Sequence, residues 1–240
     1  MLRLASLNDP LLGRPLALYN TVDNAGGEPT GVDIVYLALG KMTRQLAQLK
    51  EGAELDTWGP LGNGFPPRRA KHLIMVAGGI GQTPFLALGQ EYLGGRTFGE
   101  PKRAVERAER VTLCYGVRTA DYAAGVADFE SAGIDVRLSS DDGSVGHHGL
   151  VTALLEQILA ETAGEDRLVA CCGPEPMMHA VAAMCERNAA ECLVSLETPM
   201  ACGIGICFSC VAKITQPDGG WDYKRTCVDG PVFPAEKIVW

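Results

Sequence analysis

Four cysteines in the last part of the chain constrain it more than any other feature. They follow the pattern C-x4-C-x2-C, then sixteen residues, then a final cysteine, at Cys202, Cys207, Cys210 and Cys227. This spacing is typical of plant-type [2Fe–2S] ligand sets and differs from the paired C-x2-C motifs of zinc ribbons. Gly203 and Gly205 separate the first two cysteines, where a tight loop over a cluster requires positive φ. Buried structural cysteines, or a zinc site with the same thiolates, are the alternatives that the pattern leaves open.

The rest of the composition narrows the class of protein. A chain of 240 residues suffices for two medium or three small domains. The formal net charge of −8 argues against nucleic acid or an anionic membrane as a partner, and no apolar run reaches transmembrane length. The remaining cysteines lie in apolar segments, so we expect buried, reduced thiols in a cytoplasmic protein. They are Cys114, Cys171, Cys172, Cys185 and Cys192.

Residues 1–66 have the pattern of strands and turns. Residues 11–20 predict a turn followed by an apolar strand, and residues 32–39 predict a second strand that leads through Gly40 into a helix. A strand that turns through glycine into a helix, with Thr43 in its first turn, is an arrangement that binds phosphate. The alternative is that Thr43 only caps a surface helix.

Residues 70–77 form a continuous apolar run that ends in Gly78-Gly79-Ile80-Gly81-Gln82-Thr83-Pro84. A strand, a Gly-rich turn and a helix from Pro84 are typical of dinucleotide binding, although the turn is not the strict G-x-G-x-x-G. Strands and helices then alternate, which predicts a doubly wound parallel sheet whose ligand edge lies at the carboxyl ends of its strands. The predicted strands are 110–115, 135–139, 168–172 and 192–196, and the predicted helices are 120–132, 151–162 and 177–188.

Several groups of residues occur in an order that is known from one family. They are Arg14-Pro15-Leu16-Ala17, Gly40-Lys41-Met42-Thr43, GPLGNGF at 59–65, Gly78-Gly79-Ile80-Gly81, Asp142-Gly143-Ser144, CGPEPM at 172–177, the cluster loop, and CVDGPVF at 227–233. With these motifs the chain resembles the electron-transfer subunits of class 1B (NAD-dependent) dihydroorotate dehydrogenases, in the ferredoxin reductase superfamily. The motifs span nearly the whole chain, so the resemblance is specific even where a single motif is weak.

The resemblance implies three domains and three cofactors. Residues 1–66 would form an antiparallel barrel for FAD, residues 67–194 an α/β domain for NAD(H), and residues 195–240 a [2Fe–2S] module. Arg14 would pair with the FAD pyrophosphate, with Pro15, Leu16 and Ala17 along the flavin. The other implied FAD residues are Val35, Tyr36 and Leu37 at the flavin or ribityl chain and Met42 and Thr43 at the phosphates. The implied NAD(H) residues are Gly78, Gly79, Gly81 and Thr83 at the pyrophosphate and Cys172, Gly173 and Pro174 near the nicotinamide.

The resemblance also implies a function. Electrons from dihydroorotate would pass from FMN in a separate catalytic subunit through the cluster and FAD to NAD+, in de novo pyrimidine (UMP) biosynthesis. A heterotetramer with two copies of each subunit is implied, and no catalytic acid or base is required of this chain. One alternative is a similar subunit of a hydrogenase, a sulfide dehydrogenase or a ferredoxin:NADP oxidoreductase. Another is a non-catalytic iron–sulfur protein. Cysteine at all four ligand positions favours the first reading.

Three features depart from the family or stay open. Ala17 stands where the family usually has serine, which affects the tuning of the flavin. Residues 1–4 match a strand already inside the flavin barrel, so we expect the chain as given to be N-terminally incomplete. Arg118 is placed either to meet the 2′-phosphate of NADP or to lie solvated on the surface, which leaves the preference between NAD and NADP open.

Overall fold

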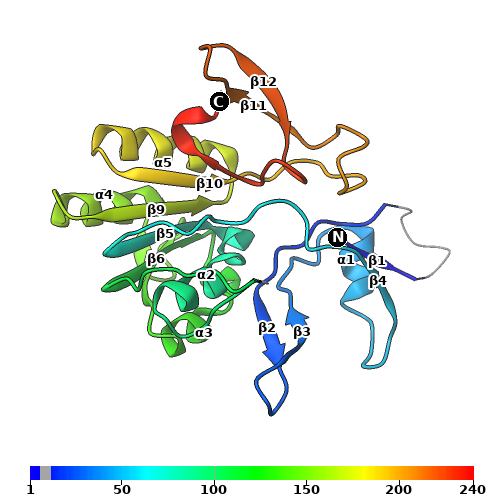
Figure 1. Cartoon of the computed structure of the whole chain (residues 1–240). Coiled ribbons are helices and arrows are strands. Elements are labelled where there is room, and N and C mark those ends of the chain that lie inside the picture. Colours follow the sequence, from blue (N-terminus) through cyan, green and yellow to red (C-terminus); the bar gives the residue numbers. More distant parts are fainter. Residues whose placement is uncertain (6–11, 100) are drawn as a thin grey trace.

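The computed structural model describes residues 1–5, 12–99 and 101–240. Its centre is a seven-stranded sheet in the order β13-β10-β9-β5-β6-β7-β8 (Figure 1). Neighbouring strands are parallel except β10 and β13, which confirms the predicted doubly wound domain. The strands are β5 (His72–Gly78), β6 (Arg110–Val117), β7 (Asp135–Ser140), β8 (His147–His148), β9 (Arg167–Cys172), β10 (Glu191–Ser195) and β13 (Val232–Pro234).

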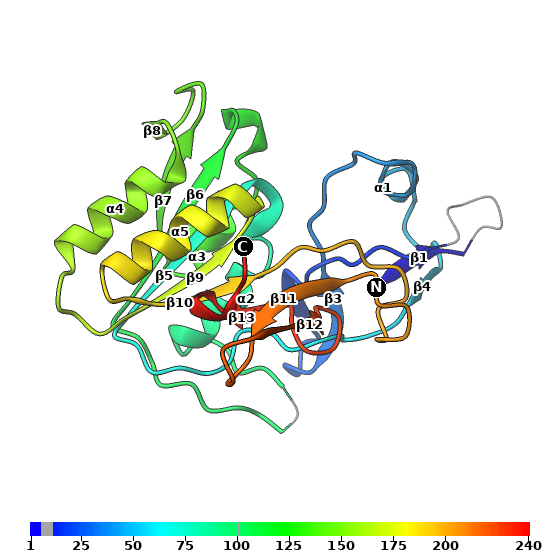
Figure 2. The same ribbon diagram turned by 90° about the horizontal axis from the view of Figure 1, so that it is seen from above.

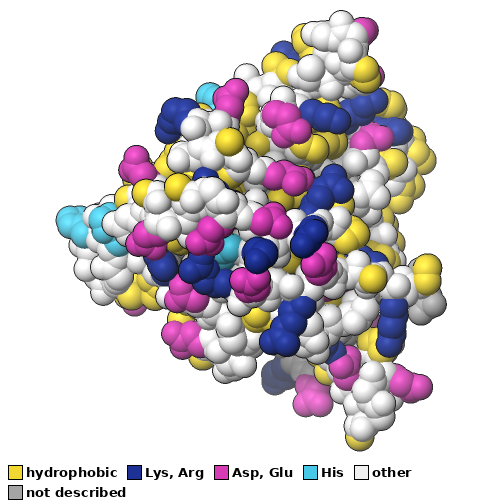
Figure 3. All heavy atoms as spheres, turned by 60° about the vertical axis from the view of Figure 1, so that its left-hand side comes forward, with side chains coloured by type: hydrophobic (Ala, Val, Ile, Leu, Met, Phe, Trp, Pro, Cys, Tyr) yellow, Lys and Arg dark blue, Asp and Glu magenta, His cyan; other side chains and the backbone are white. Residues whose placement is uncertain are grey.

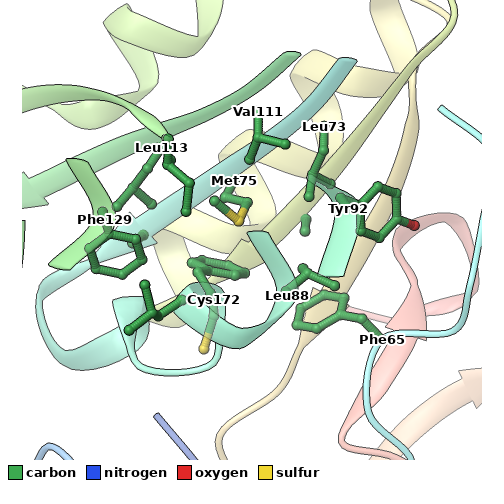
Figure 4. Packing of buried hydrophobic residues seen from close by; sticks show 14 of the residues in the cluster. Phe65, Leu73, Met75, Leu88, Tyr92, Val111, Leu113, Phe129 and Cys172 are labelled. Carbon is green, nitrogen blue, oxygen red and sulfur yellow. The ribbon is translucent and has the colours of Figure 1, made fainter. Parts of the chain in front are cut away.

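Helices cover both faces of this sheet (Figure 1). α2 (Phe85–Tyr92) and α3 (Val126–Ser131) lie on one face, and α4 (Val151–Glu161) and α5 (Glu175–Arg187) lie on the other. Because successive strand residues point to opposite faces, β5 supplies Leu73 and Met75 to the first core and Ile74 and Val76 to the second. Figure 4 shows the first core, in which Met75 and Leu113 pack with Phe129 of α3. Burial on both faces explains why these strands are continuous apolar runs in the sequence.

The N-terminal region is antiparallel, as predicted. β1 (Leu2–Leu4) pairs with β4 (Leu55–Thr57), and β2 (Asn20–Asp23) pairs with β3 (Pro29–Asp33). Within the described residues these two pairs do not close into a barrel. The strand predicted over 32–39 is confined to its first residues, because 34–39 has no strand beside it in the described part. The strand predicted within residues 11–20 begins only at Asn20. Residue 11, the first of that segment, lies outside the described chain.

α1 (Lys41–Leu46) packs on β1, and its predicted position is confirmed. The helix predicted over 120–132 is wrong as a single element, since a short 3-10 turn (Ala120–Tyr122) precedes α3. The break lies at Gly125, whose φ is +76° and whose added Cβ would lie 2.5 Å from the hydroxyl of Tyr19. That hydroxyl donates a 2.7 Å hydrogen bond to Asp128 of α3. Arg96 also pairs with Asp23, so the β2–β3 hairpin is held on the nucleotide domain.

The C-terminal region forms a second hairpin and then returns to the main sheet. β11 (Val211–Thr215) pairs with β12 (Trp221–Arg225), and β13 then runs antiparallel to β10. The predicted division at 194/195 therefore falls inside β10, and the last segment of the chain completes the nucleotide sheet. The loop before β11 lies beside the N-terminus in both views (Figures 1 and 2).

Acidic and basic side chains are intermixed over the face that Figure 3 shows. Several of them form surface ion pairs, such as Lys71 with Glu109 at 2.9 Å and Arg110 with Glu165 at 3.1 Å. Exposed pairs of this kind add little to stability. None of the helices in the described part of the chain has the length and apolarity needed to cross a bilayer.

Candidate iron–sulfur and nucleotide sites

The four cysteines of the C-terminal motif come together as two pairs of thiols. Cys202 lies beside Cys207 and Cys210 lies beside Cys227, close enough for each thiol to shift the pKa of a neighbour. The described residues contain no group of three or more His, Cys, Asp or Glu side chains placed around a single metal ion. Two adjacent pairs fit a two-iron cluster, in which each iron takes two thiolates. The donor set therefore fits [2Fe–2S] better than a mononuclear zinc site.

The loop that carries the first pair bends through residues with positive φ. Gly203 has φ +73° and Gly205 has φ +82°, as the glycines of the motif predicted. The loop directs hydrogen-bond donors at the sulfurs. The hydroxyl of Ser209 and then its backbone N–H lower the pKa of Cys207 to about 6. Backbone N–H groups of Cys207 and Ile204 lower the pKa of the Cys202 thiol, with Ile204 N at 3.4 Å from Sγ. These hydrogen bonds stabilise the thiolate form of both cysteines, which is the form that binds iron.

The second pair lies deeper in the molecule. Cys210 is 1% exposed and Cys227 is 3% exposed, and burial raises the pKa of Cys227 to about 11. Thr226 directly precedes Cys227, and its N–H donates to the Cys210 carbonyl at 2.7 Å. The first pair is by contrast half-buried at Cys202 and exposed at Cys207. The site therefore has an outer pair of thiols near solvent and an inner pair under the C-terminal hairpin.

Arg14, the residue expected at the FAD pyrophosphate, lies beside β1. The Arg14 backbone bonds to Leu2 in both directions, and its guanidinium donates to the carbonyls of Leu12 and Gly13 at 3.0 and 3.2 Å. No acidic side chain in the described residues pairs with Arg14. A guanidinium held by carbonyls without a carboxylate partner suits a phosphate group.

Three of the expected FAD residues share one small cluster. Leu16, Tyr36 and Met42 pack with Leu2 and Leu46, and Met42 is only 2% exposed. The Met42 side chain is therefore core, and its backbone is what a ligand would meet. The other expected residues are placed separately: Val35 packs against the nucleotide-domain core, Leu37 is half-buried, and Pro15 and Ala17 are exposed.

Thr43 is engaged at the start of α1. Its hydroxyl accepts a 3.0 Å hydrogen bond from the N–H of Gly40 and lies 3.3 Å from the Gly40 carbonyl. The side chain thus caps the helix, which is the alternative that the sequence left open. A phosphate at this position would be held by backbone N–H groups of the first turn rather than by the hydroxyl.

The two motifs expected at NAD(H) lie side by side at the carboxyl edge of the sheet. A Cβ added to Gly81 would lie 2.3 Å from the carbonyl oxygen of Cys172 and 2.9 Å from Cα of Gly173. A Cβ on Gly78 would lie 2.7 Å from both Pro174 and Met177. The glycines are therefore needed for the close approach of the β5 turn to the end of β9. Because Gly78, Gly81 and Gly173 have no side chains, backbone groups line the edge at which a dinucleotide binds in this fold class.

Comparison with known proteins places the chain in a family. Residues 197–239 match the family described as the iron–sulfur cluster binding domain of dihydroorotate dehydrogenase B, and residues 75–183 match the oxidoreductase NAD-binding domain. The "Dihydroorotate dehydrogenase B (NAD(+)), electron transfer subunit" of Geobacillus kaustophilus is 36% identical over 99% of this chain and 84% of its own length. That of Caldanaerobacter subterraneus is 35% identical over 89% of this chain and 77% of its own. The chain belongs to this family of electron-transfer subunits.

A solved structure supports the same conclusion. A chain described under "flavin-based electron bifurcation via the NADH-dependent reduced ferredoxin-NADP oxidoreductase structure" aligns with this electron-transfer subunit at a TM-score of 0.70. The two are 25% identical, and the match covers 95% of this chain and 80% of that one. The relatives and the family models confirm the predicted family, and the solved structure confirms its fold. The segment that matches the iron–sulfur family, residues 197–239, contains all four cluster cysteines. The segment that matches the NAD-binding family, residues 75–183, contains Gly78–Thr83 and Cys172–Pro174.

Three placements in this electron-transfer subunit were not foreseen. The Cys172 side chain is a buried member of the first core and lies at its margin in Figure 4; burial raises the pKa of its thiol to about 12, and it is the backbone carbonyl that meets Gly81. Gln82 is 0% exposed, and its carboxamide has no hydrogen-bond partner in the described residues, which makes it available to a polar ligand at this edge. Asn63 donates to the carbonyls of Val228 and Asp229 at 2.8 and 3.3 Å. The GPLGNGF motif was the signal that singled out Asn63, but nothing in it indicated this contact.

The other predicted residues are placed as follows. The five cysteines outside the motif are buried and unpaired, as expected. Arg118 is exposed at the end of β6 and has no ion-pair partner in the described residues, and its carbonyl accepts a 3.4 Å hydrogen bond from Asp142.

Proposed function

We propose that this chain accepts electrons from a partner subunit that oxidises dihydroorotate on FMN, and that it passes them to NAD+ in de novo pyrimidine (UMP) biosynthesis in the cytoplasm. One observation carries the proposal. Two pairs of thiols suited to a two-iron cluster lie in the same molecule as a phosphate-suited arginine and a Gly-rich dinucleotide edge. The family of the relatives supports the same assignment.

The chain's own residues would divide the binding between them. Cys202, Cys207, Cys210 and Cys227 would hold the [2Fe–2S] cluster. Arg14 would hold the pyrophosphate of FAD, and the turn from Gly78 to Thr83 would hold that of NAD(H). FAD, when bound, exchanges single electrons with an iron–sulfur centre and a hydride with a nicotinamide. The closely packed edge at Gly81 and Gly173 would keep NAD(H) in a fixed relation to the sheet.

The surface around the outer thiols fits a protein partner. Ile204, Ile206 and Phe208 are 56%, 74% and 60% exposed, although each is a large apolar side chain. The guanidinium of Arg225 lies 5.2 Å from the centre of the Phe208 ring. Clustered apolar side chains at a surface mark protein interfaces. We propose that the catalytic subunit covers this rim, in a complex with two copies of each subunit.

The experiment is reconstitution of the chain with iron, sulfide and FAD under anaerobic conditions, followed by titration with NADH. NADH is expected to bleach the flavin absorbance and to reduce the cluster. Cys207→Ser is expected to lose the cluster spectrum, whereas Cys192→Ser, a buried cysteine outside the motif, should keep it. If NADH leaves the flavin oxidised in the reconstituted wild type, the proposed function is wrong.

The partner requires a separate measurement. Co-expression with the dihydroorotate-oxidising subunit is expected to give a complex whose mass corresponds to two copies of each chain. The complex should reduce NAD+ when dihydroorotate is added. The similarity to a ferredoxin-NADP oxidoreductase chain makes ferredoxin the competing partner. Electron exchange with ferredoxin and none with the dihydroorotate-oxidising subunit would contradict the assignment of the partner.

A further inference from the structure

Trp58 lies between the segment that leads into Arg14, which is expected at FAD, and the loop of the outer thiols. Its indole Nε1–H donates a 3.1 Å hydrogen bond to the carbonyl of Cys202, which is 144 residues away in the chain. The far end of the same ring lies against Gly13, because a Cβ added there would be 2.4 Å from Cη2. Gly13 directly precedes Arg14. One side chain therefore contacts both regions.

The position of Trp58 is fixed from the backbone side. It follows β4, and its N–H donates to the Met1 carbonyl at 3.2 Å. The amino group of Met1 donates to the Trp58 carbonyl at 3.1 Å. The Trp58 side chain is half-buried, and the two hydrogen bonds with Met1 continue the pairing of β1 with β4. A side chain fixed in this way can transmit the position of one region to the other.

The cluster loop is closely packed where the indole meets it. A Cβ added to Gly203 would lie 3.3 Å from Nε1 of Trp58 and 2.7 Å from the side chains of Leu61 and Met1. The hydrogen bond thus orients the peptide between Cys202 and Gly203, directly after the first ligand. Groups that orient metal ligands change the affinity and the potential of the centre.

We propose that Trp58 is a positioning residue that holds the loop of the outer ligand Cys202 against the Gly13–Arg14 segment and thereby sets the cluster's potential and its electron exchange with the flavin. The inference rests on the proposed function. The ring contributes contact with Gly13, and the indole N–H contributes the bond to the Cys202 carbonyl. Phenylalanine in place of Trp58 keeps an aromatic ring but has neither the N–H nor Cη2, so it releases the bond to Cys202 and weakens the contact with Gly13.

The test is Trp58→Phe in the reconstituted holoprotein, with Trp221→Phe as the matched control. Trp221 is 50% exposed on β12. The cluster is reduced with dithionite, and its electron paramagnetic resonance spectrum and potential are recorded, followed by the stopped-flow rate of cluster reduction by NADH. Trp58→Phe is expected to keep FAD, iron and sulfide, to shift the spectrum and the potential, and to slow cluster reduction several-fold. Trp221→Phe is expected to match the wild type.

A spectrum, potential and rate of Trp58→Phe that equal those of the wild type would overturn the inference. If Trp58→Phe fails to retain the cluster, Trp58→His decides, since its ring N–H can replace the donor. Recovery of iron content and of the wild-type spectrum by Trp58→His supports the positioning role, and failure of this variant as well contradicts it. The dithionite measurements require neither NADH nor a partner, so they separate this inference from the proposed function.

Discussion

The stability of the nucleotide domain should depend on pH through His72. This residue begins β5 and is 2% exposed. Its Nδ1 lies 3.0 Å from Nη2 of Arg110, which can only donate, so Nδ1 accepts. Its Nε2 lies 2.9 Å from Oγ1 of Thr112. A proton added to Nδ1 would face the guanidinium, and the buried ring would carry a charge.

The size of the effect follows from the change in pKa. Burial, and then the charge of Arg110, lower the pKa of His72 from its ordinary value of 6.5 to about 4. Between these values the unfolded chain binds a proton that the folded chain does not, so stability falls as the pH is lowered. At about 1.36 kcal/mol per pKa unit, the full loss is about 3 kcal/mol, and about 2 kcal/mol of it appears between roughly pH 7 and pH 5.

The assay is denaturant unfolding followed by far-UV circular dichroism at these two pH values. His72→Gln removes the titrating group, and His147→Gln removes an exposed histidine at β8 as the matched control. The wild type and His147→Gln are expected to lose about 2 kcal/mol more than His72→Gln on acidification. Protonation of other groups at low pH, or loss of the cluster, is expected to change the stability of all three proteins by the same amount. Equal losses in the wild type and His72→Gln would refute the reasoning.

Two further substitutions test close contacts. Gly81→Ala places a Cβ 2.3 Å from the Cys172 carbonyl, so it is expected to weaken NADH binding and lower the melting temperature, whereas Gly64→Ala, with open space around it, should do neither. Tyr19→Phe removes the 2.7 Å hydrogen bond to Asp128 and is expected to cost about 1–2 kcal/mol of unfolding free energy by urea titration. A Tyr19→Phe protein as stable as the wild type would show that the hairpin is held by its other contacts.

The nucleotide domain was predictable because its strands and helices are defined by local patterns. β5 and β9 are buried on both faces, so their sequences are continuous apolar runs that period and length identify. The helices carry apolar residues at helical spacing on the side that meets the sheet. The cysteine spacing likewise predicted which thiols would come together, since three of them share one loop.

The remaining features depend on residues far apart in the sequence. The break at Gly125 is set by Tyr19, and no local signal within 120–132 shows that a phenol occupies the space of its Cβ. Residues 34–39 have an apolar strand pattern, but a strand requires a neighbour, and none lies there in the described chain. The contact of Trp58 with Cys202 joins two segments whose motifs each looked complete alone.

The return of β13 to the sheet links two events in the maturation of the protein. β13 begins five residues after Cys227, so the segment that supplies the last thiol also covers the edge of β10. An uncovered edge strand is a template for aggregation. During synthesis this edge stays open until residues 232–234 have been made. Cofactor assembly and protection from misassembly therefore depend on one short stretch of backbone.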